Sequence, residues 1–166
     1  MSDLVNGTLW ADASGKPIQA HGGWILPVAE NGETVFYWYG EDKSGVTVGR
    51  RMDSIGIHCY RSRDLVTWDD CGLAFEADAE SSHDALRPSG VMERPRVLFN
   101  AKTGTYVLWF HADDARYRLA GVGIAGSDSP TGPFELVDVI KPCNQDSRDF
   151  TLFEQEGGRA YLICSS

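Results

Sequence analysis

Positive charge is scarce in this sequence of 166 residues. Lysine and arginine together number 15, against 24 aspartate and glutamate residues, which gives a formal net charge of −9. Nucleic acids and anionic membrane surfaces attract basic proteins, because their phosphate groups need positive partners. The composition therefore argues against nucleic acid or a membrane as the main partner, and it favours a neutral ligand.

Long hydrophobic runs are absent as well. No stretch of the sequence approaches the roughly 20 apolar residues that a membrane-spanning helix needs. The first residues, from Met1 to Asn6, lack both the basic end and the apolar core of a signal peptide. We therefore expect a cytoplasmic chain without a membrane partner.

Metal-binding patterns are also missing. The histidines and cysteines show no zinc-site spacing, and no CxxC pair occurs among the four cysteines, Cys59, Cys71, Cys143 and Cys164. We expect free thiols, as in a cytoplasmic protein, and neither a catalytic metal nor another cofactor. A disulfide between Cys59 and Cys71, on adjacent predicted strands, is the alternative.

Glycine and aromatic residues, in contrast, are plentiful: 18 Gly accompany five Trp, six Tyr and seven Phe. Residues 96–100 and 105–111 have the composition of strands, and residues 101–104 have turn chemistry, so together they predict a hairpin. Glu93 lies just before the first predicted strand and His111 ends the second. An antiparallel hairpin brings these two side chains to one rim. A surface ion pair is the simplest interpretation of Glu93.

The same unit recurs twice. Residues 22–41 and 149–164 each combine a strand, a glycine turn and an aromatic strand, with an acidic residue at the same end. A second element, an alternating strand followed by Ser, Asp and an aromatic residue, occurs at 56–68 and again at 121–134. Repeats of roughly 40–60 residues built from short antiparallel strands are typical of an all-β fold, the β-propeller. A β-sandwich made of hairpins is the alternative.

The repeats divide the chain into about 12–87 for a first blade, 88–140 for a second, and 147–166 for the start of a third. A blade normally has four strands, and closure of a propeller needs four blades or more. We therefore expect residues 1–166 to be the N-terminal part of a single propeller catalytic domain, covering about two and a half blades.

Several motifs together resemble glycoside hydrolase family 43, and within it the exo-β-1,3-galactanase branch. The resemblance extends from about Asp12 to the end of the chain. Its more specific motifs are Ala20-His21-Gly22-Gly23, Tyr39-Gly40-Glu41 and Glu93-Arg94-Pro95. Weaker motifs, shared with related sugar-cleaving propellers, lie at 62–68, 127–134 and 147–153.

The resemblance implies a five-bladed propeller with a sugar pocket on its axis and inverting hydrolysis of glycosidic bonds. Inversion needs two carboxyl groups about 6.5–9.5 Å apart, one to protonate the leaving oxygen and one to activate water. The family's general acid lies in the fourth blade, beyond residue 166. A third carboxylate opens the third blade and raises the pKa of that acid by repulsion, and Asp149 matches it.

The family's usual base is an Asp in an Ala-Asp-Pro context, and here Ala20-His21-Gly22 stands in its place, as in the galactanase branch. The base therefore stays unassigned. The resemblance also matches Glu41, Glu93 and Tyr117 to the subsite for the terminal galactose.

We assign Asp149, as pKa modulator, and Glu93 to catalysis, and we assign Glu41, Tyr117 and His21 to substrate binding. His21 adjoins two glycines that let a backbone or ligand come close, and a buried structural imidazole is the alternative for it. Asp149 and Glu93 both begin inner strands, and Glu41 ends a strand antiparallel to one. We therefore expect the three carboxylates in one pocket at one rim, where repulsion raises at least one pKa.

The favoured function is an exo-acting, inverting hydrolase of β-linked galactose chains of the β-1,3-galactan type, with an oligo- or polysaccharide as partner. Without the fourth-blade acid, the 166-residue chain alone is expected to be inactive. One alternative is an arabinofuranosidase or xylosidase of the same family. Another is a non-catalytic sugar-binding propeller, which the missing base favours. Some family members hold a calcium ion on the axis, but the sequence has no dedicated loop for one.

Overall fold

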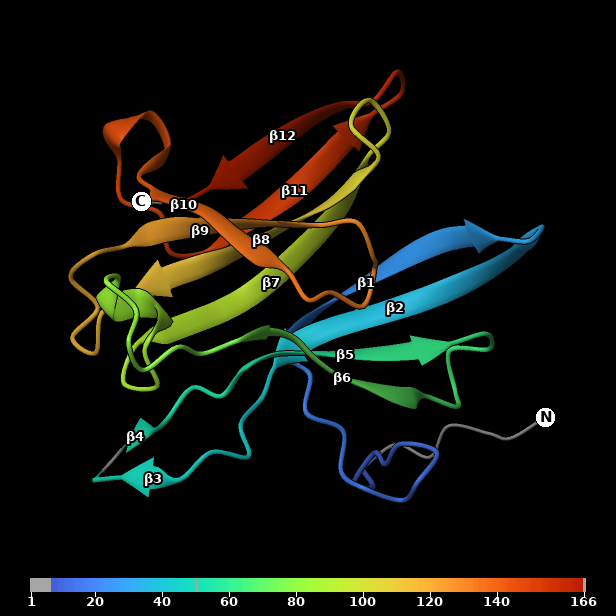
Figure 1. Cartoon of the computed structure of the whole chain (residues 1–166), viewed down its shortest axis with the longest axis horizontal. Helices are drawn as coiled ribbons and strands as arrows, with labels where there is room; N and C mark the ends of the chain where they lie inside the picture. Colours follow the sequence, from blue (N-terminus) through green and yellow to red (C-terminus); the bar gives the residue numbers. More distant parts are fainter. Residues whose placement is uncertain (1–6, 50, 166) are drawn as a thin grey trace.

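The structure of the chain is a computed structural model that describes residues 7–49 and 51–165. Residues 1–6, on which the cytoplasmic prediction depends, lie outside the described residues, as do residues 50 and 166. The described chain consists of antiparallel strands and two short 3₁₀ helices (Figure 1). Within these residues, no helix has the length and apolarity needed to cross a membrane.

The first sheet is a four-stranded meander in the order β1–β2–β5–β6. Its strands are β1 (His21–Glu30), β2 (Glu33–Glu41), β5 (Gly56–Ser62) and β6 (Asp69–Glu76). Asn31 and Gly32 both take positive φ in the turn between β1 and β2, as an Asn-Gly pair predicts. A small hairpin, β3 (Thr47–Val48) and β4 (Arg51–Met52), projects from the connection between β2 and β5 (Figure 1).

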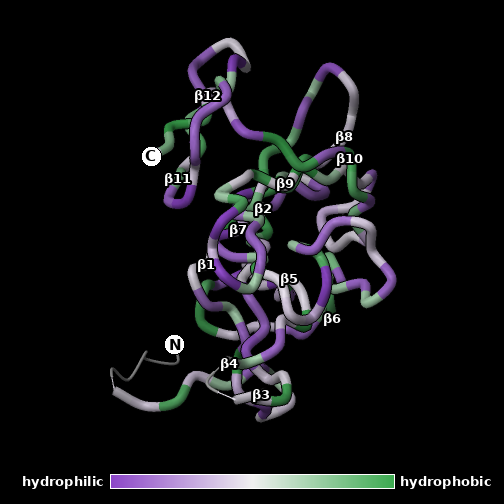
Figure 2. Tube along the Cα trace, turned by 90° about the vertical axis from the view of Figure 1, so that its left-hand side faces the viewer, coloured by the Kyte–Doolittle hydropathy of each residue, from purple (hydrophilic) through white to green (hydrophobic). Residues whose placement is uncertain are grey.

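The second sheet repeats the meander in the order β10–β9–β8–β7. Its strands are β7 (Val91–Asn100), β8 (Thr105–Asp113), β9 (Gly121–Ser127) and β10 (Glu135–Ile140). The short helix η1 (Asp84–Leu86) precedes this sheet, and η2 (Pro142–Asn144) follows it. A last hairpin, β11 (Phe150–Gln155) with β12 (Arg159–Cys164), forms a separate two-stranded sheet (Figures 1 and 2).

The first strand of each unit faces the others. β7 contacts β1 of the first sheet and β11 of the last hairpin. Sheets that meet through their first strands and splay outward form the successive blades of a propeller. The all-β propeller fold expected from the repeats is thus confirmed for these residues, while the five blades of the prediction refer to a longer chain. The proposed limits of the blades contain the sheets, but the assignment of all of them to one catalytic domain stays a prediction.

Side chains from the facing sheets form one hydrophobic core. Hydrophobic and hydrophilic residues alternate over short distances along the strands (Figure 2), so each sheet turns one face inward. Trp68 and Phe134, the aromatic residues that end the second repeated element, are both buried. The backbone N–H of Phe134 donates to the Ala74 carbonyl at 2.8 Å, and its ring meets Tyr39 edge-on at 6.3 Å. The loop after β9 therefore fastens the second sheet to the first.

Two details refine the sequence analysis. Glu93 does not precede its strand, as expected, but lies inside β7, because the strand begins at Val91 and continues through Pro95. A proline is compatible with a strand at a bulge, where no ladder hydrogen bond is lost, and the register of β7 shifts there. All four cysteines are free thiols, so the alternative disulfide between Cys59 and Cys71 is not formed.

Candidate functional site

Both inner strands are irregular at the same end. The pairing of β1 with β2 shifts between His21 and Trp24, and the pairing of β7 with β8 shifts between Glu93 and Arg96. Arg94 takes a φ of 52°, a left-handed conformation that is strained for a residue with a side chain. Bulges of this kind bend a strand and redirect its side chains, and they often lie beside functional sites.

The glycine pair after His21 packs closely within the first sheet, at Gly23, and against the second sheet, at Gly22. A Cβ at Gly23 would lie 2.4 Å from Trp38 Nε1, and a Cβ at Gly22 would lie 3.6 Å from the Arg94 Cα. The Arg96 guanidinium donates to the Gly22 carbonyl at 3.1 Å, which joins the two bulges. The close backbone approach expected from this glycine pair is therefore present.

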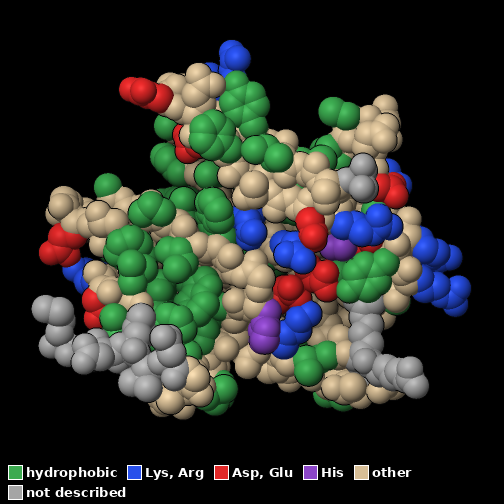
Figure 3. All heavy atoms as spheres, turned by 180° about the vertical axis from the view of Figure 1, so that it is seen from behind, with side chains coloured by type: hydrophobic (Ala, Val, Ile, Leu, Met, Phe, Trp, Pro, Cys, Tyr) green, Lys and Arg blue, Asp and Glu red, His purple; other side chains and the backbone are tan. Residues whose placement is uncertain are grey.

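A cavity of about 470 Å³ opens beside the two bulges. His21 and Glu41 pair across β1 and β2, Glu93 enters from β7, and Tyr117 enters from the loop after β8. The complete lining consists of His21, Glu41, Asp42, Lys43, Met52, Ser54, Gly90, Val91, Met92, Glu93 and Tyr117. Four of the five residues predicted for the site thus share one cavity. On the face seen in Figure 3, acidic, basic and histidine side chains gather in one area beside a broad hydrophobic one.

Glu93 is held by two side chains. The Tyr117 hydroxyl donates to its Oε1 at 3.0 Å, and Nδ1 of His111 lies 3.4 Å from its Oε2. His111 lowers the pKa of the Glu93 carboxyl, and Tyr117 adds to this, while burial acts in the opposite direction. Glu93 is therefore poised as an ionised acceptor that faces the cavity, and its predicted pairing with His111 is confirmed.

Glu41 behaves in the opposite way. Burial raises the pKa of its carboxyl, and the nearby charge of Glu93 adds to that rise, although an ion pair with Lys43 opposes it. One pocket thus contains one carboxyl with a raised pKa and one with a lowered pKa. Pairs of this kind allow one group to donate a proton or hydrogen bond while the other accepts.

Asp149, the fifth predicted site residue, lies at the same rim but outside the cavity lining. Its Oδ1 lies 2.7 Å from Nε of Arg94, the residue next to Glu93, and its side chain is 65% exposed. The structure therefore brings Glu41 and Glu93 into one cavity and places Asp149 one arginine away from it.

Two contributors to the site were not singled out from the sequence. Lys43 pairs with Glu41, and Asp113, which is completely buried, lies 3.1 Å from Nε2 of His111. His111 and Asp113 are two residues apart on β8, so the two-residue period of a strand places them on one face. That period is the signal that could have identified Asp113.

No group of three or more His, Cys, Asp or Glu residues in the described part of the chain is arranged to hold a metal ion. The polar groups of the cavity instead form pairs with one another. The chemistry available to these residues is hydrogen bonding and proton transfer.

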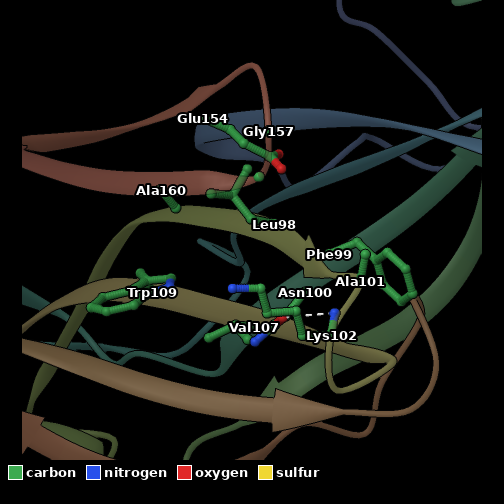
Figure 4. Close-up of a pocket in the computed structure, with 11 residues that line it drawn as sticks. Leu98, Phe99, Asn100, Ala101, Lys102, Val107, Trp109, Glu154, Gly157 and Ala160 are labelled. Carbon is green, nitrogen blue, oxygen red and sulfur yellow. Dashed lines mark hydrogen bonds between the residues drawn. The ribbon is translucent and has the colours of Figure 1, made fainter.

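A second cavity, of about 380 Å³, lies between β7, β8 and the last hairpin. Its walls are mainly apolar, with Leu98, Val107, Trp109 and Ala160 among the side chains drawn in Figure 4. Its two charged residues, Lys102 and Glu154, come from the outer ends of the two hairpins. Because it lacks convergent carboxylates, this cavity has less catalytic potential than the one around Glu93.

Solved structures with the same fold are known. An exo-β-1,3-galactanase from Phanerochaete chrysosporium, solved with galactose, has 39% identity and a TM-score of 0.86 over 97% of this chain and 36% of its own. A β-1,3-galactosidase of glycoside hydrolase family 43 has 38% identity and a TM-score of 0.84 over 96% and 32%. An exo-β-1,3-galactanase from Clostridium thermocellum has 31% identity and a TM-score of 0.80 over 97% and 35%.

The chain spans about a third of the length of these structures. No protein-family model and no curated protein matches the sequence. Over nearly its whole length the chain is similar to propeller proteins of glycoside hydrolase family 43. The predicted resemblance to the exo-β-1,3-galactanase branch is thereby confirmed.

Proposed function

We propose that this chain is part of a glycoside hydrolase that removes galactose from the ends of β-1,3-linked galactan chains with inversion. The observation that carries the proposal is the cavity in which Glu93, Glu41, Tyr117 and His21 converge. Its support from similarity is the identity of 30–39% to β-1,3-galactanases and β-1,3-galactosidases, one of which was solved with galactose and with β-1,3-galactotriose.

In this proposal Glu93 and Glu41 form hydrogen bonds with the hydroxyl groups of the terminal sugar. The lowered pKa of Glu93 suits acceptance of hydrogen bonds from a sugar. Tyr117 is 43% exposed and offers a ring face for stacking as well as a hydroxyl. His21 is exposed at the mouth of the same cavity.

Asp149 is proposed to raise the pKa of a general acid outside these 166 residues. Asp149→Asn should then lower kcat and move the basic limb of the pH profile to lower pH, because the acid would lose its proton more readily. An unchanged basic limb would remove this role.

The test is hydrolysis of β-1,3-galactan and a panel of aryl glycosides by the whole protein, that is, the full-length natural polypeptide that contains these residues. Release of galactose, appearing first as the α-anomer in proton NMR, is the expected result. Faster cleavage of aryl arabinofuranosides or xylosides would support the arabinofuranosidase or xylosidase alternative. Saturable sugar binding without turnover would support a non-catalytic sugar-binding propeller.

The 166-residue chain on its own is proposed to be inactive. Proton donation to a leaving group typically contributes about 10²–10⁴-fold to rate, and the acid is expected beyond residue 166. Turnover by this chain at a rate close to that of the whole protein would contradict two expectations. These are that the general acid lies beyond residue 166 and that the chain is the N-terminal part of a longer domain.

A further inference from the structure

Asp113 is a buried carboxylate that the proposed function does not use. It ends β8, its side chain is fully buried, and it lies behind the cavity rather than in its lining. Burial of a charge is costly unless the charge is well paired, so each partner of this carboxylate has to be accounted for.

One oxygen of Asp113 faces His111. Its Oδ2 lies 3.1 Å from His111 Nε2, and the other ring nitrogen of His111 lies 3.4 Å from Glu93 Oε2. The imidazole therefore lies between the two carboxylates, with one ring nitrogen facing each of them.

The other oxygen of Asp113 holds a loop. Its Oδ1 accepts the backbone N–H of Asp114 at 2.9 Å and that of Leu119 at 2.7 Å. These two residues bracket the loop that carries Tyr117, which takes a left-handed φ of 56°. Tyr117 then donates its hydroxyl to Glu93. Both side chains that contact the Glu93 carboxylate are therefore fixed by the same buried group.

We propose that Asp113 is the positioning residue of the candidate site: one oxygen holds His111 against Glu93, and the other holds the loop that brings Tyr117 to the same carboxylate. Asp113 itself touches no substrate. It fixes the direction and the charge of the Glu93 carboxylate. This role deepens the proposed function, and of the two measurements below only the kinetic one depends on that function.

Two variants disturb the contact of Asp113 with His111 and keep its bonds to the loop. Asp113→Asn keeps an oxygen for the loop but presents an amide to His111, so the carboxylate that faces His111 Nε2 is lost. His111→Gln removes the imidazole while the loop bonds stay. The matched control is His58→Gln, because His58 also lies between two carboxylates, Asp42 and Asp70.

The first measurement is a carboxyl ¹³C NMR titration of Glu93 in the whole protein. The groups that face Glu93 are His111, Tyr117, Glu41 and Lys43, and contact with His111 is the largest cause of its lowered pKa. We expect the Glu93 titration to move to higher pH in Asp113→Asn and in His111→Gln, and to stay in place in the control.

The second measurement is kcat and KM on β-1,3-galactan across pH. Loss of a partner that orients a site residue often costs roughly 10–100-fold, and we expect this range in kcat/KM, with the acid limb moved to higher pH. The control should stay within about twofold, as a substitution away from the site does. If Asp113→Asn does not fold, His111→Gln carries the test.

An unmoved Glu93 titration in both variants would overturn the proposal, even if activity fell. A wild-type protein that hydrolyses no galactan would instead refute the proposed function, and the titration would still decide the role of Asp113.

Discussion

The two sheets each contain a histidine between two carboxylates, and only one of these histidines serves a cavity. His58 belongs to β5 of the first sheet and His111 to β8 of the second. Each also has a tyrosine ring beside it. Tyr60 stacks on His58 at 4.6 Å, whereas Tyr117 lies tilted at 6.1 Å from His111.

The His58 group is closed towards the cavity, although Asp70 on its far side is 33% exposed. Its Nδ1 lies 3.0 Å from Asp42 and its Nε2 lies 2.6 Å from Asp70. Asp42 borders the cavity, but its second oxygen accepts both the backbone N–H and the hydroxyl of Ser44. Burial lowers the pKa of His58, yet the two carboxylates outweigh it and the pKa is raised. The group therefore links β5 and β6 to the residue that follows β2.

The His111 group is open on one side. Asp113 is buried behind the histidine, and Glu93, in front of it, is 24% exposed and borders the cavity. Each Glu93 oxygen has one side-chain contact, and a carboxylate oxygen has capacity for a further hydrogen bond. A histidine with two carboxylates thus forms a structural link in the first sheet. In the second sheet the same combination holds Glu93 as a hydrogen-bond acceptor that faces the cavity. The difference lies in whether the outer carboxylate borders the cavity: Glu93 does, whereas Asp70, although it is 33% exposed, does not.

The largest expected effect on activity comes from neutralising Glu93, the outer carboxylate of the open group. Glu93→Gln in the whole protein should lower kcat/KM by roughly 10- to 150-fold, because a hydrogen bond to a charged group is worth about 1.5–3 kcal/mol. Both KM and kcat should change, since Glu93 is expected to contact the substrate before the transition state. Steady-state kinetics on β-1,3-galactan measure this.

The matched change in the closed group is Asp70→Asn, which should leave kcat/KM within about twofold of wild type. Equal losses in both variants would show that the two groups do not differ in function, and the comparison would then fail.

The architecture and the pairing of Glu93 with His111 could be predicted from the sequence, but the His58 group could not. The repeats predicted the two meanders and the last hairpin, and hairpin geometry predicted the pairing of Glu93 with His111. Glycine and aromatic residues in fixed order carry this information, because turn type and strand period follow from local sequence.

The partners of the carboxylates could not be predicted in the same way. The ion pair of Arg94 with Asp149 joins β7 to the residue before β11, and it depends on the left-handed φ of Arg94 at a bulge. A bulge changes which side chains face the rim. The two-residue alternation of a strand therefore does not predict side-chain direction at the bulges, which lie beside the site. The pairing of Lys43 with Glu41 depends in the same way on how the chain turns after β2.

A smaller effect is expected on stability when the closed group is broken. The folded-state pKa of His58 is raised above its ordinary value of about 6.5, so its protonated form favours the folded chain. This contribution is complete below about pH 6.5 and is lost as pH rises through the raised folded value. The pKa values of Asp42 and Asp70 are lowered, so their contribution needs a pH above about 4.

His58→Gln should therefore cost at most about 1 kcal/mol of unfolding free energy between about pH 4.5 and 6.5, because Asp70 is partly exposed and its ion pair is screened. The cost should shrink at alkaline pH. Urea denaturation of the wild type and the variant at a series of pH values measures it. A cost that grows with rising pH would contradict the sign of the His58 shift.

The smallest expected effect concerns the two tyrosines. Tyr117→Phe removes the hydroxyl that donates to Glu93 Oε1, a hydrogen bond worth about 0.5–1.5 kcal/mol. KM for galactan should rise about 2- to 10-fold, while the ring remains for stacking and kcat changes less. Tyr60→Phe removes a hydroxyl that accepts the Gln19 backbone N–H at 2.9 Å, so it should lower stability and leave KM unchanged. Kinetics and urea denaturation on both variants would separate the roles. A rise in KM for Tyr60→Phe as large as that for Tyr117→Phe would mean that the closed group also reaches the substrate.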